Sequence, residues 1–256
     1  MRKFLPLVLF LTSFVSAQSR FDGTWEMKTD TLRFSGAPEE YVLDKGMYHC
    51  TTCVPAVDVK TDGTDQKVTG HPYFDSIAVR ILDGSSVRFT MKKGGKTTFE
   101  CTETVSSDRK TMIEEFTNTS EAETVTGKAG FKRVGAGPTG AHALSGKWSM
   151  QTVNNATAAG TLTTYQSTAG GLKISDGSQS YEAKFDGKDY PVSGAAHATV
   201  SLRLINDSTM EETDKLDGKV ATVARMTVSM DGKSMTVESS DKQRGGMMTY
   251  TAVKRP

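Results

Sequence analysis

An internal repeat constrains the fold of this 256-residue chain more than any other feature of its sequence. When the chain is shifted by 123 residues, residues 76–113 align with residues 199–236 without a gap, and 12 of these 38 positions are identical. The same shift places Gly23-Thr24-Trp25 on Gly146-Lys147-Trp148. Each copy is long enough to bury a core of its own. We therefore expect two domains, at residues 20–134 and 143–256, joined by a Gly- and Pro-containing linker at residues 135–142.

Apolar and polar side chains alternate within each copy, as in half-buried β-strands. Phe99, Cys101 and Val105 share one face of a predicted strand, and Ala224 and Met226 lie on the same face of the aligned strand. Seven Asp-Gly pairs, several of them beside such segments, predict tight hairpin turns. We expect an all-β protein made of two tandem antiparallel barrels of about eight strands each. Closure into a barrel is favoured over an open sandwich because it removes exposed strand edges.

Residues 1–17 have the organisation of a secretory signal peptide. Arg2 and Lys3 precede an apolar run at residues 4–14, and small residues follow at positions 15–17. The apolar run is too short to span a membrane as a helix. These features predict a secreted or periplasmic protein that does not span the membrane.

The charge balance gives no indication of a polyanionic partner. Lys and Arg number 31 against 30 Asp and Glu, a formal net charge of +1. Removal of Arg2 and Lys3 with the signal peptide changes this to 29 − 30 = −1. We therefore expect no nucleic-acid partner. The sequence gives no prediction of the oligomeric state.

Each copy resembles a lipocalin-like barrel in its first and last predicted strands. Trp25 and Trp148 lie in Gly-x-Trp motifs at the start of the copies, and Arg133 and Arg255 lie at their ends. In lipocalin-like barrels the arginine stacks on the tryptophan and closes one end of the barrel, with a favourable cation–π contact. The resemblance implies that Arg133 closes on Trp25 and Arg255 on Trp148. The paired copies are also similar to exported bacterial proteins of uncharacterised function, a similarity that implies no activity.

Cys50 and Cys53 form a Cys-x-x-Cys motif in the first copy. In an oxidising compartment two cysteines this close are expected to form a disulfide across a turn. A thiol-redox pair is an alternative, although the motif lies between strands rather than before a helix. A metal site made of these cysteines, Cys101 and His49 or His71 is another alternative, but no sequence feature places those residues together. Cys101 is expected to be a small buried thiol.

Candidate ligand-binding residues lie on predicted inward faces or in loops near a barrel mouth: His71, Tyr73, Phe99, Tyr190, His197 and Met226. The alternative interpretation is that the loop residues are ordinary surface aromatics and that Met226 is core filler. Methionine is also abundant enough to suggest Cu(I) binding, but Met226 alternates in step with core residues. We predict no metal site and no cofactor.

The sequence gives no support for catalysis. It has no Gly-x-Ser-x-Gly motif, and its adjacent glutamates, such as Glu114-Glu115 and Glu211-Glu212, point to opposite faces of a strand. We therefore predict an exported, non-enzymatic protein that holds a small apolar ligand in one or both barrels. The first alternative is an envelope or extracellular interaction module with solidly packed barrels. The second is a thiol-redox or metal-handling protein centred on Cys50 and Cys53.

Overall fold

The computed structural model describes residues 19–71, 73–120, 123–176, 179–193 and 197–256. The predicted signal peptide at residues 1–17 lies outside these residues. The described part of the chain consists of β-strands, turns and one 3-10 helix, η1 (Ala158–Gly160), which confirms the all-β prediction. No helix in these ranges has the length and apolar character needed to cross a membrane.

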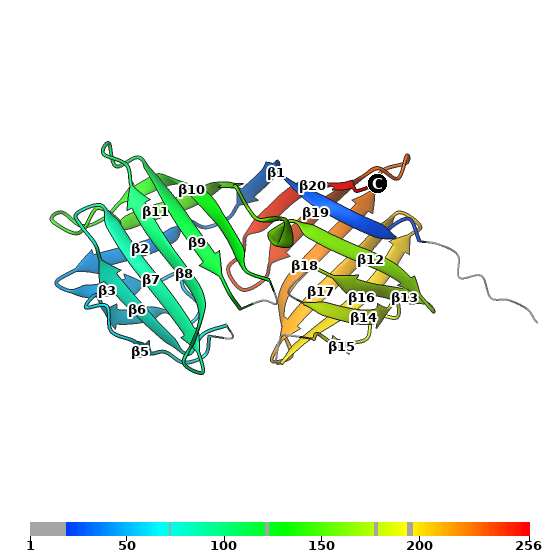
Figure 1. Cartoon of the computed structure of the whole chain (residues 1–256), viewed down its shortest axis with the longest axis horizontal. Coiled ribbons are helices and arrows are strands. Elements are labelled where there is room, and N and C mark those ends of the chain that lie inside the picture. Colours follow the sequence, from blue (N-terminus) through cyan, green and yellow to red (C-terminus); the bar gives the residue numbers. More distant parts are fainter. Residues whose placement is uncertain (1–18, 72, 121–122, 177–178, 194–196) are drawn as a thin grey trace, which may run out of the picture.

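Within the described residues, the strands form two antiparallel sheets of ten strands each, and each sheet curls into a nearly closed barrel (Figure 1). The first barrel comprises β2 (Glu39–Asp44), β3 (Met47–Cys50), β4 (Val57–Lys60), β5 (Gln66–Lys67), β6 (Ser76–Ile81), β7 (Ser86–Lys93), β8 (Lys96–Val105), β9 (Thr111–Asn118), β10 (Val125–Ala136) and β11 (Gly146–Asn154). The second barrel comprises β1 (Gly23–Ser35), β12 (Leu162–Thr168), β13 (Gly171–Ser175), β14 (Ser180–Lys184), β15 (Tyr190–Pro191), β16 (Ala198–Asn206), β17 (Thr209–Leu216), β18 (Lys219–Val228), β19 (Ser234–Asp241) and β20 (Met247–Lys254).

Isolated bridges bring the ends of each sheet together at equivalent points of the two repeats. In the first barrel Asp62, in the Asp-Gly turn after β4, bridges to Arg80 on β6. In the second barrel Asp186 bridges to Arg203 in the same way. The two-barrel prediction is therefore confirmed, with ten strands in each sheet rather than about eight because short strands such as β5 and β15 complete the sheets.

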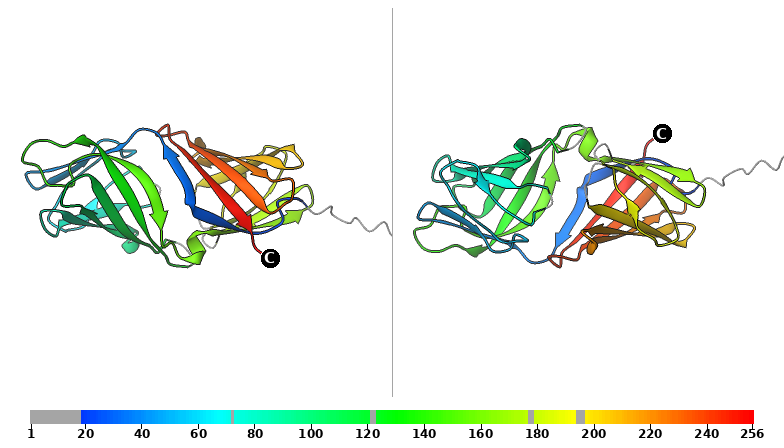
Figure 2. Two further views of the ribbon diagram at one scale, coloured as in Figure 1. Left: turned by 90° about the horizontal axis from the view of Figure 1, so that it is seen from above. Right: turned by 90° about the horizontal axis from the view of Figure 1, so that it is seen from below.

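The first strand of each repeat belongs to the barrel of the other repeat. β1, the first strand of the first repeat, lies between β12 and β20 of the second barrel. Figure 2 shows this blue strand beside the red C-terminal strand. β11, the first strand of the second repeat, lies between β10 and β2 of the first barrel. The first barrel therefore spans residues 39–154, and the second combines residues 23–35 with 162–254. These limits differ from the boundaries predicted from the repeat.

The exchange also changes the partners of the two tryptophans. Arg133 lies over Trp148, with its Cζ 4.0 Å from the ring centroid. Lys254 lies over Trp25, with its Nζ 5.2 Å from the ring centroid. The pairing of Arg133 with Trp25, which the lipocalin resemblance implied, is therefore wrong, and so is that of Arg255 with Trp148. Arg255 instead forms an ion pair with Glu26, at 3.2 Å.

The two tryptophans are nevertheless held by the same local contact. Trp148 Nε1 donates a hydrogen bond to the carbonyl of Leu144, at 2.8 Å, and Trp25 Nε1 donates one to that of Phe21, at 2.7 Å. Both rings are fully buried. Equivalent residues of the two repeats thus make the same contact in both barrels. Each tryptophan nevertheless lies on a strand that belongs to the barrel of the other repeat.

The segment predicted as a linker is part of the first barrel. Its first two residues, 135 and 136, lie within β10. Beyond them, the His142 backbone N–H donates to the Leu43 carbonyl at 3.1 Å, and just after the predicted linker Ser145 Oγ accepts from the Leu43 N–H at 2.8 Å. The segment therefore connects two neighbouring strands of one sheet rather than two domains.

Cys50 and Cys53 form the predicted disulfide, with an S–S distance of 2.07 Å. The bridge follows β3 and closes the turn toward β4. Cys101 is free and buried, as expected. Burial raises the pKa of its thiol well above the ordinary value, with a further contribution from the nearby Glu114.

Candidate functional site

The second barrel contains an interior cavity of about 310 Å³. One part of its lining is apolar and includes Ile174, Val192, Ala224, Met226 and Val237. The other part is polar and includes Tyr165, Gln179, Tyr181, Glu212, Asp214 and Tyr250. A barrel cavity of this size can hold one small ligand. This mixed lining differs from the mainly apolar interior that an apolar ligand would require.

Three of the residues that line the cavity replace larger residues of the first repeat. The strand pairs β7/β17, β8/β18 and β9/β19 align with the 123-residue shift. At three interior positions the first repeat has phenylalanine where the second has a polar residue: Phe89 and Glu212, Phe99 and Thr222, Phe116 and Ser239. Phe89 belongs to the buried core of the first barrel, and the half-buried Phe99 and Phe116 pack against that core. Their three counterparts line the cavity of the second.

Two carboxyl groups of β17 face this cavity. Glu212 and Asp214 are two residues apart on one strand and therefore point to the same side. Burial and the neighbouring Asp214 carboxylate raise the pKa of Glu212 to about 8, against a hydrogen bond donated by Tyr181 that lowers it. Burial raises the pKa of Asp214 to about 6. Burial therefore makes both carboxyl groups harder to ionise, Glu212 more so than Asp214, so Asp214 is the first of the two to ionise as the pH rises.

Tyrosine rings surround the acidic pair. Burial, reinforced by the charge of Glu212, raises the pKa of Tyr165 well above its ordinary value and that of Tyr250 to about 12. Both hydroxyls therefore remain protonated. Tyr165 Oη also lies 3.9 Å from Met226 Sδ. The site combines tyrosine hydroxyl groups, aromatic rings and a pair of ionisable carboxyl groups, which together suit a cationic group.

Two of the residues predicted from sequence to bind a ligand line this cavity, namely Tyr73 and Met226. Tyr73 belongs to the loop before β6 of the first repeat and is 62% exposed, so it lies at the rim. Met226 is buried on β18. Phe99 faces the interior of the first barrel instead, where its ring stacks on Phe116 with centroids 6.0 Å apart.

The structure does not bring the other three predicted residues into the cavity lining. His71 is 9% exposed and stacks on Phe74 with ring centroids 4.4 Å apart. Tyr190 donates a hydrogen bond to Asp186, at 3.1 Å. His197 is exposed, and its Nδ1 lies 3.7 Å from Asp217 Oδ1. The side chains of these three residues therefore contribute to local packing and to turn structure.

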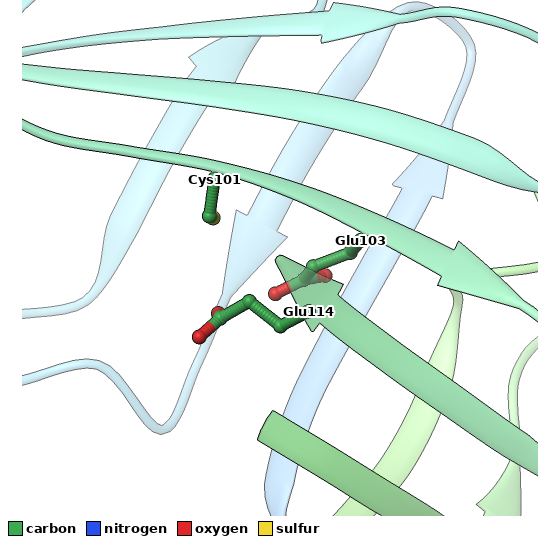
Figure 3. Close-up of side chains that lie close together, drawn as sticks. All are labelled: Cys101, Glu103 and Glu114. Atoms are coloured by element: carbon green, nitrogen blue, oxygen red, sulfur yellow. The ribbon is translucent and has the colours of Figure 1, made fainter. Parts of the chain in front are cut away.

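A different polar cluster lies inside the first barrel (Figure 3). Cys101 and Glu103 on β8 and Glu114 on β9 converge there, and their candidate ligand atoms lie within 4.8 Å of one another. Glu103 is only 5% exposed. Its Oε2 is buried and has no hydrogen-bond partner among the described residues.

Sequence reasoning missed both clusters of acidic residues, although a signal for each was present. Glu103 alternates in step with Cys101 and Val105, which placed a charged residue on the inward face. Glu212 aligns with the apolar Phe89 of the other repeat. A charged residue at a position that is apolar in the other copy marks an interior site that the fold itself does not require.

Comparisons with known proteins assign no family. No protein-family model matches the chain, and neither a curated protein nor a solved structure is significantly similar to it.

Proposed function

We propose that the chain is an exported, non-enzymatic binding protein that holds one small molecule inside its second barrel. The observation that carries this proposal is the cavity of about 310 Å³, lined on one side by apolar residues and on the other by Glu212, Asp214 and tyrosines. The lipocalin-like character of the barrels, with the ligand in the interior, is part of the proposal. Export rests on the pattern of residues 1–17.

The ligand is a small, mainly apolar molecule with one cationic group, such as a protonated amine. Its apolar part packs against Ile174, Val192 and Val237. Its cationic group pairs with Asp214 and lies among the tyrosine faces, because burial of a cation is favourable only when an opposite charge accompanies it. An anionic ligand of the same size would be rejected by the same carboxylate.

The alternative function, an interaction module with solidly packed barrels, suits the first barrel better than the second. Its interior has phenylalanines at the positions where the second barrel has Glu212, Thr222 and Ser239. We therefore confine the proposed ligand to the second barrel.

The test uses two polarity-sensitive dyes of equal size, one with an ammonium group and one with a sulfonate group. We expect the full chain to bind the ammonium dye with a Kd of about 10 µM or lower, equivalent to roughly −7 kcal/mol, and the sulfonate dye at least ten-fold more weakly. Mass spectrometry of an organic extract of the purified protein identifies any ligand that remains bound.

Two variants locate the dye. Thr222→Phe with Ser239→Phe introduces the residues that fill the first barrel, and we expect it to abolish dye binding. Thr227→Phe is the matched control, because Thr227 is on the exposed face of β18. Asp214→Asn should remove the preference for the ammonium dye while leaving room for both dyes. Equal binding by the filled variant and the wild type would show that the dye does not occupy the cavity and would refute the proposal.

A further inference from the structure

The first barrel has a polar cluster that the fold does not need. Glu103 on β8 and Glu114 on β9 are directly opposite each other in the antiparallel register. Cys101 lies two residues before Glu103 and therefore on the same face of β8. Two carboxyl groups directly opposite on neighbouring strands destabilise a sheet when both are ionised, unless a cation neutralises them.

The second repeat shows what the fold requires at these positions. The 123-residue shift places Ala224 on Cys101, Met226 on Glu103 and Val237 on Glu114. All three are buried in the core of the second barrel, on the same strands of the same architecture. An apolar trio therefore satisfies the packing of this module, so the thiol and the two carboxyl groups of the first barrel have another role.

The buried Glu103 carboxyl points into this cluster with one oxygen unpartnered. Glu103 is 95% buried, from an exposure of 5%. Its Oε2 accepts no hydrogen bond from the described residues, and Figure 3 shows its side chain directed toward Glu114. Burial of an unpaired carboxylate oxygen is costly, so native proteins pair such atoms with a donor or a cation.

We propose that Cys101, Glu103 and Glu114 bind a zinc ion inside the first barrel. Thiolate and carboxylate together match the borderline character of Zn²⁺, whereas Mg²⁺ and Ca²⁺ avoid sulfur and Cu⁺ avoids carboxylates. Three protein ligands leave the fourth tetrahedral position for water. The two positive charges offset the two facing glutamates.

The cluster has the dimensions of a zinc site after small side-chain rotations. Its ligand atoms lie within 4.8 Å of one another, and tetrahedral ligands of zinc are separated by about 3.5 Å, given Zn–S and Zn–O distances of about 2.3 and 2.1 Å. Glu114 is half-buried, whereas Glu103 is buried, so Glu114 is the carboxyl group of the cluster that is nearer to solvent. The carboxylate of Glu39 lies nearby and adds negative charge, which raises the pKa of both Glu103 and Glu114 further.

The test measures zinc binding by the full chain, free of a histidine tag and with Cys101 reduced. We expect about one Zn²⁺ per chain with a Kd below about 1 µM in a chelator competition. Co²⁺ should substitute for Zn²⁺ and produce an intense near-ultraviolet band from the cobalt–thiolate bond. Metal binding should also raise the melting temperature, which needs no knowledge of any activity.

The matched variant transplants the second repeat into the first: Cys101→Ala, Glu103→Met and Glu114→Val. It should fold, since the second barrel has these residues, and should lose zinc binding at least 100-fold. Glu115→Val is the control, because Glu115 is exposed on the opposite face of β9. It should bind zinc as the wild type does.

Two results would overturn the proposal. One is a wild-type chain that takes up no zinc under these conditions, in which case the glutamates share protons or a water molecule. The other is a transplanted variant that still binds one zinc ion, which would place the metal elsewhere. If the transplanted variant does not fold, Cys101→Ser alone decides, because the cobalt–thiolate band must then disappear. The ammonium-dye experiment concerns the other barrel, so either proposal can fail without the other.

Discussion

The guanidinium group of Arg133 lies 4.0 Å from the ring centroid of Trp148, and the two residues belong to different copies of the repeat. Arg133 also donates hydrogen bonds to the carbonyls of Arg109 and Ser145, both at 2.6 Å. The contact closes the first barrel with a strand from the second repeat. The barrels are therefore joined through their structural elements and not merely by a linker.

We predict that Trp148→Ala destabilises the first barrel by about 3–5 kcal/mol, the usual cost for a large buried aromatic residue. Arg133→Ala should also destabilise it, because the variant loses a cation–π contact worth about 1–2 kcal/mol together with the hydrogen bonds to the carbonyls of Arg109 and Ser145. A double-mutant cycle should show coupling between Arg133 and Trp148 and none between Arg133 and Trp25. The measurement is denaturant unfolding, and coupling of Arg133 to Trp25 instead would contradict the strand exchange.

Fragments of the chain test the exchange directly. Residues 39–154 contain every strand of the first barrel, including β11, so this fragment should unfold cooperatively as a monomer. Residues 20–134 lack β11 and Trp148 and should be less stable by at least about 3 kcal/mol. Circular dichroism with denaturant titration compares the two. A fragment 20–134 as stable as 39–154 would mean that β1 can fill the place of β11.

The architecture could be predicted from sequence because its determinants are local. Period-two alternation and Asp-Gly turns specify hairpins, and the repeat specifies that there are two such units. The exchange of β1 and β11 could not be predicted in this way. Both strands begin with Gly-x-Trp, so their sequences fit either position and give no preference.

The cavity was only partly predictable for a related reason. Alternation in step with the core predicts that Met226 lies in the interior, whereas two adjacent glutamates such as Glu211 and Glu212 point to opposite faces of a strand and give no such prediction. The alignment of the two repeats does mark Glu212, because it places this residue on the interior Phe89. The contact of Tyr181 with Glu212 joins strands that are distant in sequence, and alternation within one strand says nothing about it.

The thiol content of the chain provides a separate prediction. Cys50 and Cys53 are bridged, so one free thiol should be found after unfolding without reductant. In the native protein Cys101 should react with a thiol reagent at least ten-fold more slowly than in the unfolded chain, because burial raises the pKa of its thiol and blocks access. Non-reducing peptide mapping identifies the bridge. A linkage that includes Cys101, or three reactive thiols, would contradict this assignment.

The stability of the second barrel should depend on pH. Burial and Asp214 raise the pKa of Glu212 to about 8 in the folded chain, so folded Glu212 holds its proton more tightly than the unfolded chain does. The stability associated with this proton is fully present below the ordinary glutamate pKa and is lost as pH rises to about 8. The second barrel should therefore become less stable across this range.

The two tryptophans allow this change to be assigned to one barrel. The chain has two tryptophans, Trp25 in the second barrel and Trp148 in the first, so Trp148→Phe leaves Trp25 as the sole fluorescent reporter of the second barrel. In that background, denaturant unfolding should show stability falling from about pH 5 to pH 8, and Glu212→Gln should flatten the slope because glutamine does not titrate. Glu211→Gln is the matched control, since Glu211 lies next to Glu212 on the opposite face of β17, paired with Arg225. An unchanged slope in Glu212→Gln, or an equal loss of slope in Glu211→Gln, would show that the buried carboxyl does not carry the pH dependence.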